Sequence, residues 1–472
     1  MNNKFDVAYI VSHGFAARMV LQTDLLVKLK QAGLKVALIT PDKADQNLVE
    51  NVAKSGIEII EYKPSSTLWN SEYIRLRKYL FEDIKKNAAL WEKHQHDLNI
   101  AKLRSSFLPL FKIRIFYLIY LVFNHFPLLR KLIAGLEKKS LHDPVANAII
   151  KNLDSRLVIS TYPVNLMESR LLYAANKYAA TKTIIHLLSW DNITCKGYFP
   201  QLADYYISWG DIMNREFISY YNIDEKRIFK TGVPHFDLHF EVRGSLVYKN
   251  ILKQKGLNPD LPYLFFAMSA PYFSPNEIDI VEWLAKKIDE NEFGELSLIV
   301  RPHPQNVTGN MADKTWIDRL KKIESSRVSV DWPKLVKSKL NWSMQMNDML
   351  DLAHLIEGCA ISINSGSTVS IDSLLHNKPV LLTFFDAYEP LPMWTSIRRV
   401  AAYGHLKNLV DSGGVVVADN FNNFTEQITR FLKDPDWNHT EREKIMLMEC
   451  FKNDGMATER VVNAIQMTVD AG

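Results

Sequence analysis

The sequence predicts an α/β protein with two successive doubly wound parallel sheets, and three observations support this fold class. Short apolar runs typical of buried strands alternate with helical patterns over residues 7–61 and 156–237, and the alternation begins again at residue 263. Glycine or proline turns follow several of the runs, as parallel βα units require. The 472 residues and the 47% hydrophobic content allow two or three full cores.

The first half opens with a strand, helix and strand. Residues 7–12 form an apolar run, a helical pattern follows and ends at Gly33, and strands are expected at 35–40 and 57–61. Ligands of such sheets bind beyond the carboxyl ends of the strands, where Ser12, His13 and Gly14 fall. His13 is a candidate general base, and the alternative is a capping or merely exposed histidine.

The alternation stops over residues 68–143, which are expected to form a helical insertion. Its uninterrupted apolar core, residues 115–123, is short of the ~20 residues needed to span a bilayer. Basic residues flank this aromatic-rich run, with no acid before Glu137. Two interpretations stay open: a segment lying on an anionic membrane surface, or a helix buried against the domain core.

Strands resume at 156–160 and 182–188, and the second opens onto a polar loop over residues 189–197. Asp191 is a second candidate base, or it orients the first-half histidine, and Lys196 is expected to meet a phosphate or an acidic sugar. Trp190 and Asn192 are placed with the residues that line the acceptor site or cleft. Asp-Asn and Lys-Gly pairs are also ordinary turn formers, so a plain loop is the alternative.

Two more strands, at 203–208 and from residue 228, complete this half. His235 follows the second of them in a proline-bearing loop, and it is grouped with the acceptor or cleft residues. The expected domains are residues 1–240, a linker over 241–262, a second domain over 263–435, and terminal helices over 436–472 that return to the first domain.

In the second half, the strand over residues 296–300 ends in Arg301-Pro-His-Pro. The two prolines stiffen the loop and hold His303 at the carboxyl edge of the strand beside Arg301. We expect Arg301, His303 and Pro304 to bind the nucleotide of a donor. Prolines also simply end strands, which is the alternative.

Residues 359–384 form the stretch around which this half is organised. An apolar strand is followed by the turn Asn364-Ser-Gly, a helix over 367–375 and a strand over 380–384. Small hydroxylated residues at the amino end of a helix predict a phosphate site formed by Ser365, Gly366, Ser367 and Thr368. Ordinary N-cap residues are the alternative. Asp372, five residues beyond Ser367, is expected to bind the ribose hydroxyls.

Composition limits the function classes. A net charge of +4 argues against a dedicated nucleic-acid binder. The three cysteines lack metal-ligand spacing and fit a reducing compartment. The amino terminus leads into a strand without the hydrophobic core of a signal peptide, so we expect a cytoplasmic protein. Peripheral contact with the cytoplasmic face of the inner membrane is a further expectation.

Together these motifs resemble the GT-B glycosyltransferases, and most closely bacterial surface-carbohydrate enzymes of the superfamily that includes CDP-glycerol glycerophosphotransferases and GT-B sialyl- or Kdo-transferases. His303-Pro304 matches the His-Pro motif of the donor half, and Ser365, Ser367 and Thr368 match its Ser-Ser/Thr motif. Residues 453–460 resemble the Asp-Gly-Lys-Ala-Ser-Glu-Arg segment of such chains, with Met456 in place of the usual lysine. The resemblance covers about residue 151 to the end.

The resemblance implies a nucleotide-sugar donor bound by the second half, a glycan or lipid-linked glycan acceptor bound by the first, and reaction in a cleft between them. It implies no cofactor and no metal, because such enzymes stabilise the leaving nucleotide with helix dipoles and basic side chains. We expect an inverting transfer in bacterial surface polysaccharide synthesis, for example of lipopolysaccharide or capsule. The alternatives are a CDP-glycerol-type polyol-phosphate transferase, a non-hydrolysing UDP-sugar 2-epimerase and a non-enzymatic polysaccharide-binding module.

Overall fold

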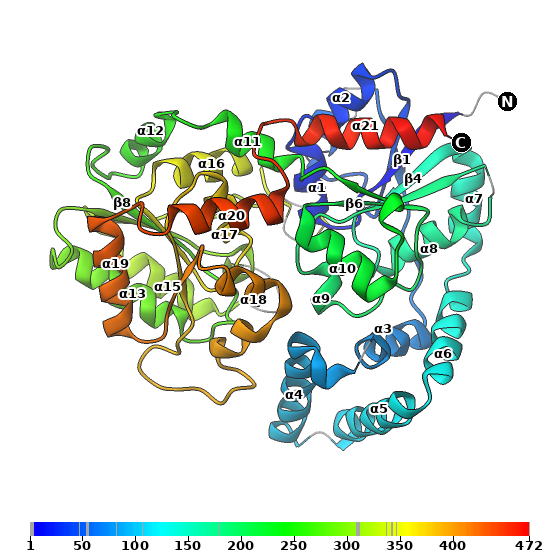
Figure 1. Cartoon of the computed structure of the whole chain (residues 1–472), viewed down its shortest axis with the longest axis horizontal. Coiled ribbons are helices and arrows are strands. Elements are labelled where there is room, and N and C mark those ends of the chain that lie inside the picture. The colour runs from blue at the N-terminus through cyan, green and yellow to red at the C-terminus, as the bar shows by residue number, and fades with distance from the viewer. Residues whose placement is uncertain are drawn as a thin grey trace. The chain divides into compact units, whose positions relative to one another are not determined.

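The computed structural model describes residues 4–471, apart from residues 47, 53–55, 82, 106, 179, 308–311, 337, 341, 342 and 346. The chain forms two compact units (Figure 1). The first consists of Met1–Pro234, Val336–Met346 and Met456–Gly472, and the second of His235–Leu335 and Asn347–Gly455.

The first unit contains a seven-stranded parallel sheet of order β3-β2-β1-β4-β5-β6-β7. Its strand order reverses at β1 and β4, as in a doubly wound sheet. The strands are β1 (Phe5–Ile10), β2 (Val36–Thr40), β3 (Glu58–Glu61), β4 (Ser155–Ser160), β5 (Lys182–His186), β6 (Tyr205–Ser208) and β7 (Ile228–Lys230).

Helices cover this sheet, and the core between them is apolar because a parallel sheet is buried on both faces. Ala8, Ile10 and Val158 of the central strands pack with Ile150 and Leu171 from two of the helices. The helices of the unit are α1 (Gly14–Leu21), α2 (Leu25–Gln31), α7 (Pro144–Leu153), α8 (Leu166–Ala175), α9 (Asn192–Cys195), α10 (Asp211–Tyr221) and α21 (Ala457–Asp470), with the π-helix η1 (Leu48–Val52) and the 3-10 helix η4 (Glu225–Arg227).

The insertion is helical, as predicted. It has a small core of its own formed by Tyr79, Ile84, Leu90 and Tyr120, and its long helices follow one another from α3 to α6 in Figure 1. The elements are α3 (Leu68–Phe81), η3 (Ile84–Lys86), α4 (Ala88–Leu103), α5 (Phe107–His125) and α6 (Pro127–Ser140).

Helix α5 is longer than the nine-residue apolar run suggested. It continues through Lys112 and Arg114 and reaches 19 residues. By length and composition it is apolar enough to cross a membrane, and 11% of its most apolar window is buried in the structure. No other helix of the described residues meets that test. A helix this long equals the thickness of the bilayer hydrocarbon core, so the expectation that the segment is too short to span does not hold.

The second unit contains a six-stranded parallel sheet of order β10-β9-β8-β11-β12-β13. The prediction of two successive doubly wound parallel sheets is confirmed. The strands are β8 (Tyr263–Ala267), β9 (Ser297–Arg301), β10 (Val328–Val330), β11 (Ile361–Asn364), β12 (Val380–Thr383) and β13 (Val416–Ala418).

The helices of this unit pack on both faces of its sheet around two apolar clusters. They are α11 (His235–Glu241), α12 (Val247–Gln254), α13 (Glu277–Asp289), α14 (Pro304–Val307), α15 (Lys314–Lys322), α16 (Asp348–Gly358), α17 (Val369–Leu375), α18 (Gly404–Asp411), α19 (Phe421–Lys433) and α20 (His439–Cys450), with the 3-10 helix η5 (Ile397–Ala402).

Three segments do not follow a simple division of the chain into two halves. The stretch over 241–262 is built into the core of the second unit, where Leu252 and Leu257 pack with β8. Residues 336–346 belong to the first unit, and Ser343 Oγ donates to Asp45 Oδ2 over 2.8 Å. Helix α21 also belongs to the first unit, where Arg460 Nε donates to Thr231 O over 2.8 Å.

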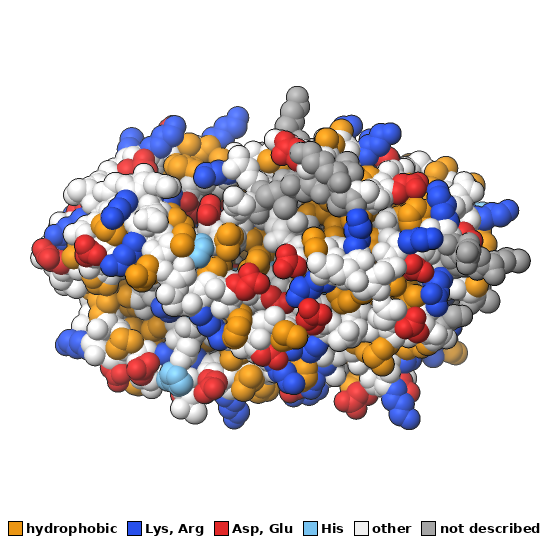
Figure 2. All heavy atoms as spheres, turned by 90° about the horizontal axis from the view of Figure 1, so that it is seen from above, with side chains coloured by type: hydrophobic (Ala, Val, Ile, Leu, Met, Phe, Trp, Pro, Cys, Tyr) orange, Lys and Arg blue, Asp and Glu red, His pale blue; other side chains and the backbone are white. Residues whose placement is uncertain are grey.

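Charged side chains of both signs are interspersed with single hydrophobic ones on the face drawn in Figure 2, where no broad area carries one sign alone. This distribution agrees with the small net charge of +4. It does not resemble the continuous basic stripe of a nucleic-acid-binding face.

Candidate functional site

In the first unit, His13 stands between β1 and α1, at the carboxyl edge of the sheet. Its ring packs on Tyr162, with 4.8 Å between ring centroids, and its Nδ1 lies 3.2 Å from Ser12 Oγ. Burial, with a smaller contribution from the nearby charge of Lys196, lowers the pKa of His13 to about 4. The imidazole is therefore neutral at pH 7. Gly14 is the buried first residue of α1, so it serves the backbone turn and offers no side chain.

Glu168, which the sequence analysis did not single out, organises this edge. It is fully buried in α8 and accepts hydrogen bonds from the backbone N–H groups of Thr161 and Tyr162, both over 2.7 Å. The hydroxyls of Ser160 and Ser12 also donate to it, over 2.6 Å and 2.5 Å. Burial raises the pKa of Glu168, and these hydrogen bonds oppose the shift.

The network around Glu168 fixes the tautomer of His13. Ser12 has one hydroxyl proton and donates it to Glu168 Oε1. In the contact between Ser12 and His13, the donor must therefore be His13 Nδ1–H and the acceptor Ser12 Oγ. The Nε2 lone pair is consequently the basic site of His13, which is the arrangement that a general base needs.

The loop after β5 carries an ion pair. Lys196 Nζ lies 2.8 Å from Asp191 Oδ2, and Ser189 Oγ donates to Asp191 Oδ1 over 2.5 Å. The charge of Asp191 raises the pKa of Lys196, so the lysine is charged at pH 7. Trp190 and Asn192 are only 5% and 3% exposed, which differs from the expectation that they line a ligand site.

The insertion is bound to these loops through buried charges. Arg77 of α3 lies 2.7 Å from Glu137 of α6 and donates to Val164 O over 2.6 Å, beside the turn that holds Glu168. Tyr198, at the end of the polar loop, donates to the same glutamate. The insertion therefore borders the edge of the sheet that carries His13.

In the second unit, Arg301 is neutralised rather than presented to a ligand. It ends β9 and forms ion pairs with Asp331 and with Asp348 at 2.6 Å. Lys255 also pairs with Asp331, over 2.6 Å. Burial acts to raise the pKa of Asp331, and the charges of Arg301 and Lys255 outweigh it and lower that pKa. The cluster fixes the loop base, so the expected role of Arg301 as a free phosphate-binding cation is not what its contacts show.

His303 and Pro304 occupy the loop after β9 as predicted from the sequence. Gln305 N donates to His303 Nδ1 over 3.1 Å, so the proton of a neutral ring lies on Nε2. Pro304 begins the short helix α14, where a missing N–H is harmless. Asn306 Nδ2 donates to Ser269 O over 2.9 Å and connects this loop to the loop after β8.

The turn after β11 is closed by its own side chains. Asn364 Oδ1 accepts from Gly366 N over 2.9 Å and from Ser367 N over 2.8 Å. Gly366 has a φ of +86°, in the left-handed region that favours glycine. Ser367 and Thr368 remain half-buried, and α17 begins at Val369, two residues later than predicted. Two backbone donors expected for an anion are thus already used by Asn364.

Ser365 faces the interior. Its hydroxyl donates to Glu277 of α13 and lies 2.8 Å from Thr383 Oγ1, and the residue is 4% exposed, so the side chain supports the turn from inside. Glu277 also accepts from Ser269 N over 2.6 Å. Burial raises the pKa of Glu277 to about 7. Glu277 repeats in the second sheet the role of Glu168 in the first: a buried carboxylate that joins the loops after two central strands.

Asp372 and His235 lie together in the second unit, whereas the sequence analysis placed His235 with the first half. His235 Nε2 is 3.3 Å from Asp372 Oδ1, and His239 Nε2 is 3.5 Å from the same oxygen. The contacts continue from His239 to His376 over 2.9 Å and from His376 to Glu357 over 2.6 Å. Asp372 therefore faces histidines of α11. A ribose hydroxyl would have to compete with these histidines for the carboxylate.

The two sheets thus each carry a polar edge at the carboxyl ends of their strands. The first edge carries Ser12, His13 and Lys196, and the second carries His303 after β9 and Ser367 and Thr368 after β11. Among the described residues, no group of three or more His, Cys, Asp and Glu side chains is arranged to hold a metal ion. The buried glutamates could not be found from sequence, because their partners are up to 156 residues away.

Comparison with known proteins adds a family and a fold. A family model described as CDP-Glycerol:Poly(glycerophosphate) glycerophosphotransferase matches residues 197–467. A search of curated proteins found no match.

Solved structures share the architecture at low identity. A UDP-N-acetylglucosamine 2-epimerase matches with a TM-score of 0.56 and 12% identity, over 100% of this chain and 97% of that one. A UDP-GlcNAc 2-epimerase from Neisseria meningitidis bound to UDP-GlcNAc gives 0.55 and 12%, over 98% and 100%. A variant of the wall teichoic acid polymerase TagF gives 0.52 and 12%, over 99% and 90%. At these identities the likeness concerns the fold alone, and it confirms the predicted GT-B type.

Proposed function

The chain belongs to the CDP-glycerol:poly(glycerophosphate) glycerophosphotransferase family, and from this premise we propose that it transfers a polyol phosphate from a CDP-linked donor to a hydroxyl group of a cell-surface polymer. The family match over residues 197–467 carries the proposal. It favours the polyol-phosphate alternative over the sugar transfer expected from sequence. The coarser statement, a transferase of cell-surface polymer synthesis, holds for either donor.

The reaction assigns a role to each polar edge. The acceptor oxygen attacks the phosphorus that bears the polyol, the bond to the bridging oxygen breaks, and CMP leaves. His13 Nε2 takes the acceptor proton, since its pKa near 4 keeps it neutral at pH 7. His303, Pro304, Ser367 and Thr368 hold the departing nucleotide, with His303 Nε2–H as a donor to its phosphate.

Glycosyl transfer is the second candidate, and the ion pairs of Arg301 favour it. Phosphoryl transfer concentrates charge on the transferred group and is usually assisted by cations. Arg301 is already neutralised by Asp331 and Asp348, so it adds no net charge there. In this alternative the acceptor attacks the anomeric carbon of a nucleotide sugar with inversion, and the nucleoside diphosphate leaves.

The proposal also covers cofactor and location. No metal or cofactor is required, since hydrogen-bond donors and the histidines provide the stabilisation. We place the enzyme in the cytoplasm, in peripheral contact with the inner membrane through α5 and α6 and acting on a lipid-linked glycan. Activity that survives chelation with EDTA supports metal independence, and activity restored only by a divalent ion opposes it.

A donor assay tests the proposal. Purified protein is incubated with membranes from a deletion strain and with labelled CDP-glycerol, CDP-ribitol, or a UDP-, GDP- or CMP-linked sugar. Label from a CDP-polyol appearing in polymer with equimolar CMP confirms polyol-phosphate transfer. Label from a nucleotide sugar confirms the second candidate, and product NMR then shows whether configuration is inverted. Interconversion of a UDP-sugar without acceptor would contradict both.

A further inference from the structure

A cavity of about 550 Å³ lies where the insertion meets the sheet of the first unit. Its volume is typical of small-ligand sites. None of its lining residues was singled out from the sequence, and none belongs to the two polar edges described above. The lining residues are Ser65, Thr67, Trp69, Asn70, Tyr73, Ser140, His142, Asp143, Pro144 and Arg170.

The fold places this cavity at the ligand-binding edge of the sheet. Ser65 follows the carboxyl end of β3, Asp143 caps α7, and Arg170 lies on α8 two residues beyond Glu168. Ligands of doubly wound sheets bind at the carboxyl ends of strands. Helix α8 therefore contributes both to the cavity and, through Glu168 and Ser12, to the setting of His13.

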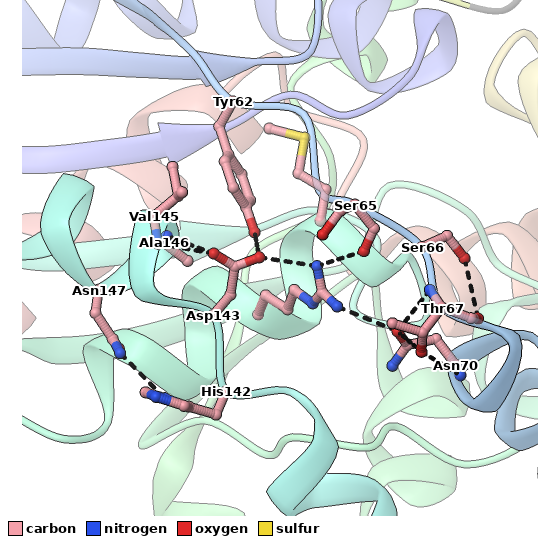
Figure 3. Close-up of polar contacts among 12 residues, drawn as sticks. Tyr62, Ser65, Ser66, Thr67, Asn70, His142, Asp143, Val145, Ala146 and Asn147 are labelled. Atoms are coloured by element: carbon pink, nitrogen blue, oxygen red, sulfur yellow. Dashed lines mark hydrogen bonds and ion pairs between the residues drawn. The ribbon is translucent and has the colours of Figure 1, made fainter.

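A buried ion pair forms the floor. Arg170 is 4% exposed, and its Nη1 lies 2.8 Å from both Asp143 Oδ2 and Ser65 O (Figure 3). Tyr62 donates to the same carboxylate oxygen over 3.0 Å. Burial acts to raise the pKa of Asp143, but hydrogen bonds, led by that of Ala146 N–H, and the charge of Arg170 lower it. The pair is thus fully ionised at pH 7, and its charges cancel.

Hydrogen-bonding capacity remains around this floor. Within the described structure, the buried Nε of Arg170 has no hydrogen-bond partner. Asn70 is 4% exposed, and its Oδ1 accepts from Thr67 and from Arg170 Nη2, which leaves the two Nδ2 hydrogens as donors. Figure 3 shows Thr67 and Asn70 joined by hydrogen bonds. The Arg170 Nε is shielded from solvent, so the donors that a ligand can reach are the second hydrogen of Arg170 Nη2 and the Nδ2 hydrogens of Asn70.

An aromatic platform forms the rim. Trp69 and Tyr73 are four residues apart on α3 and therefore share one face of the helix. Trp69 is 73% exposed, which is unusual for so large an apolar group. Flat aromatic faces above a polar floor are suited to a ring that has one apolar face and a rim of hydroxyls.

We propose that this cavity binds a neutral sugar residue of the acceptor glycan, with the ring stacked on Trp69 and its hydroxyls bonded to Asn70 and Arg170. A neutral ligand is favoured over a phosphate because Asp143 already balances Arg170, and the remaining lining residues carry no fixed charge. This inference rests on the proposed function, since it specifies the acceptor that the transferase would use.

Saturation-transfer NMR with methyl glycosides of glucose, galactose and N-acetylglucosamine tests it, with inorganic phosphate and glucose 1-phosphate as charged probes. We expect at least one neutral glycoside to bind wild type saturably, and Trp69→Ala and Tyr73→Ala each to weaken it by tenfold or more. Leu68→Ala is the matched control, because Leu68 is 85% exposed on the same helix and does not line the cavity. Circular dichroism shows whether each variant is folded.

The outcomes separate this inference from the proposed function. Binding of no neutral glycoside, stronger binding of the phosphate probes, or equal binding by wild type and Trp69→Ala overturns the sugar site. If transfer is active, Trp69→Ala should raise KM for the acceptor at least tenfold and leave nucleotide binding unchanged. If a glycoside binds wild type but not Trp69→Ala, and the protein is inactive with every donor, the sugar site is supported and the proposed transferase function is contradicted.

Discussion

Glu277 is a residue whose environment makes stability depend on pH. It is fully buried, and its pKa is raised from 4.5 to about 7 by burial. Between those values the folded protein keeps a proton that the unfolded chain has lost, so the contribution of Glu277 to stability is fully present below pH 4.5 and is lost as pH rises toward 7. We predict that Glu277→Gln removes this loss, so that the variant gains on wild type by about 1.4 kcal/mol per pH unit from pH 5 to 7.

Urea unfolding at pH 5, 6, 7 and 8 measures the difference. Glu290→Gln, a surface change just beyond the same helix, should follow wild type at every pH. Parallel pH dependences for wild type and Glu277→Gln would show that Glu277 does not titrate in this range.

His13 gives the second residue-scale prediction. A base with a pKa near 4 is deprotonated at pH 5.5 and above, so kcat/KM of wild type should stay flat from pH 5.5 to 8. His13→Ala should lower it by roughly 10²–10⁴-fold. Lys196→Met removes the smaller of the two causes of the low pKa, so it should move the acidic limit of kcat/KM to higher pH without bringing it to 6.5. An acidic limb near pH 6.5 in wild type, or full activity of His13→Ala, rules out this assignment.

At the scale of an element, the turn after β11 depends on one glycine. Gly366 has a φ of +86°, and a Cβ there would stand 2.9 Å from Leu406 Cδ1. Gly366→Ala should therefore destabilise the protein by roughly 1–3 kcal/mol and abolish nucleotide binding. Gly294→Ala is the matched control, because Gly294 has a φ of +83° and nothing within 4 Å of the added atom.

Thermal unfolding and nucleotide titration of both variants separate backbone strain from the clash. The control should lose only the strain energy and keep nucleotide binding. Equal loss of stability and unchanged binding in the two variants would show that the turn tolerates a side chain and is not the nucleotide site.

Helices α5 and α6 carry the second element-scale prediction. Their exposed apolar residues include Leu118 and Leu128, at 60% and 78%, and Lys112, Arg114, Arg130 and Lys131 lie among them. We expect the protein to bind phosphatidylcholine vesicles only when phosphatidylglycerol is added, and high salt to release it.

The double change Leu118→Glu with Leu128→Glu should abolish vesicle binding, whereas Leu246→Glu, at a site 63% exposed in the second unit, should not. Retention in membranes after washing with high salt and alkaline carbonate would instead indicate that α5 spans the bilayer.

For the whole molecule, periodicity was sufficient to predict the fold. Apolar runs of strand length marked most of the strands in the described residues, because the central strands of a parallel sheet are buried on both faces. Sequence patterns could not predict contacts between residues that are far apart in the chain. Arg301 is neutralised by acids 30 and 47 residues away, and Asp372 meets His235 across 137 residues. The return of residues 336–346 to the first unit and the cavity beside Arg170 depend on tertiary packing in the same way.

The sequence predicted those features of the candidate site that depend on local structure. Turns after strands placed His13 and His303 at carboxyl edges, because that position follows from strand direction alone. The contacts and burial of each side chain could not be predicted in this way: Ser365 faces Glu277, and Trp190 is buried. Those outcomes depend on neighbours contributed by distant strands and helices.

The central claim is that the second unit binds the nucleotide of an activated donor, and thermal denaturation with CDP, CMP, UDP and GDP tests it most directly. A ligand at a hundred times its dissociation constant stabilises the folded state by about 2.7 kcal/mol. We predict that CDP or CMP raises the Tm of wild type and of His439→Ala, whose histidine is exposed in the same unit, and that His303→Ala and Ser367→Ala lose the shift. Stabilisation by no nucleotide, or an undiminished shift in both His303→Ala and Ser367→Ala, would contradict the account.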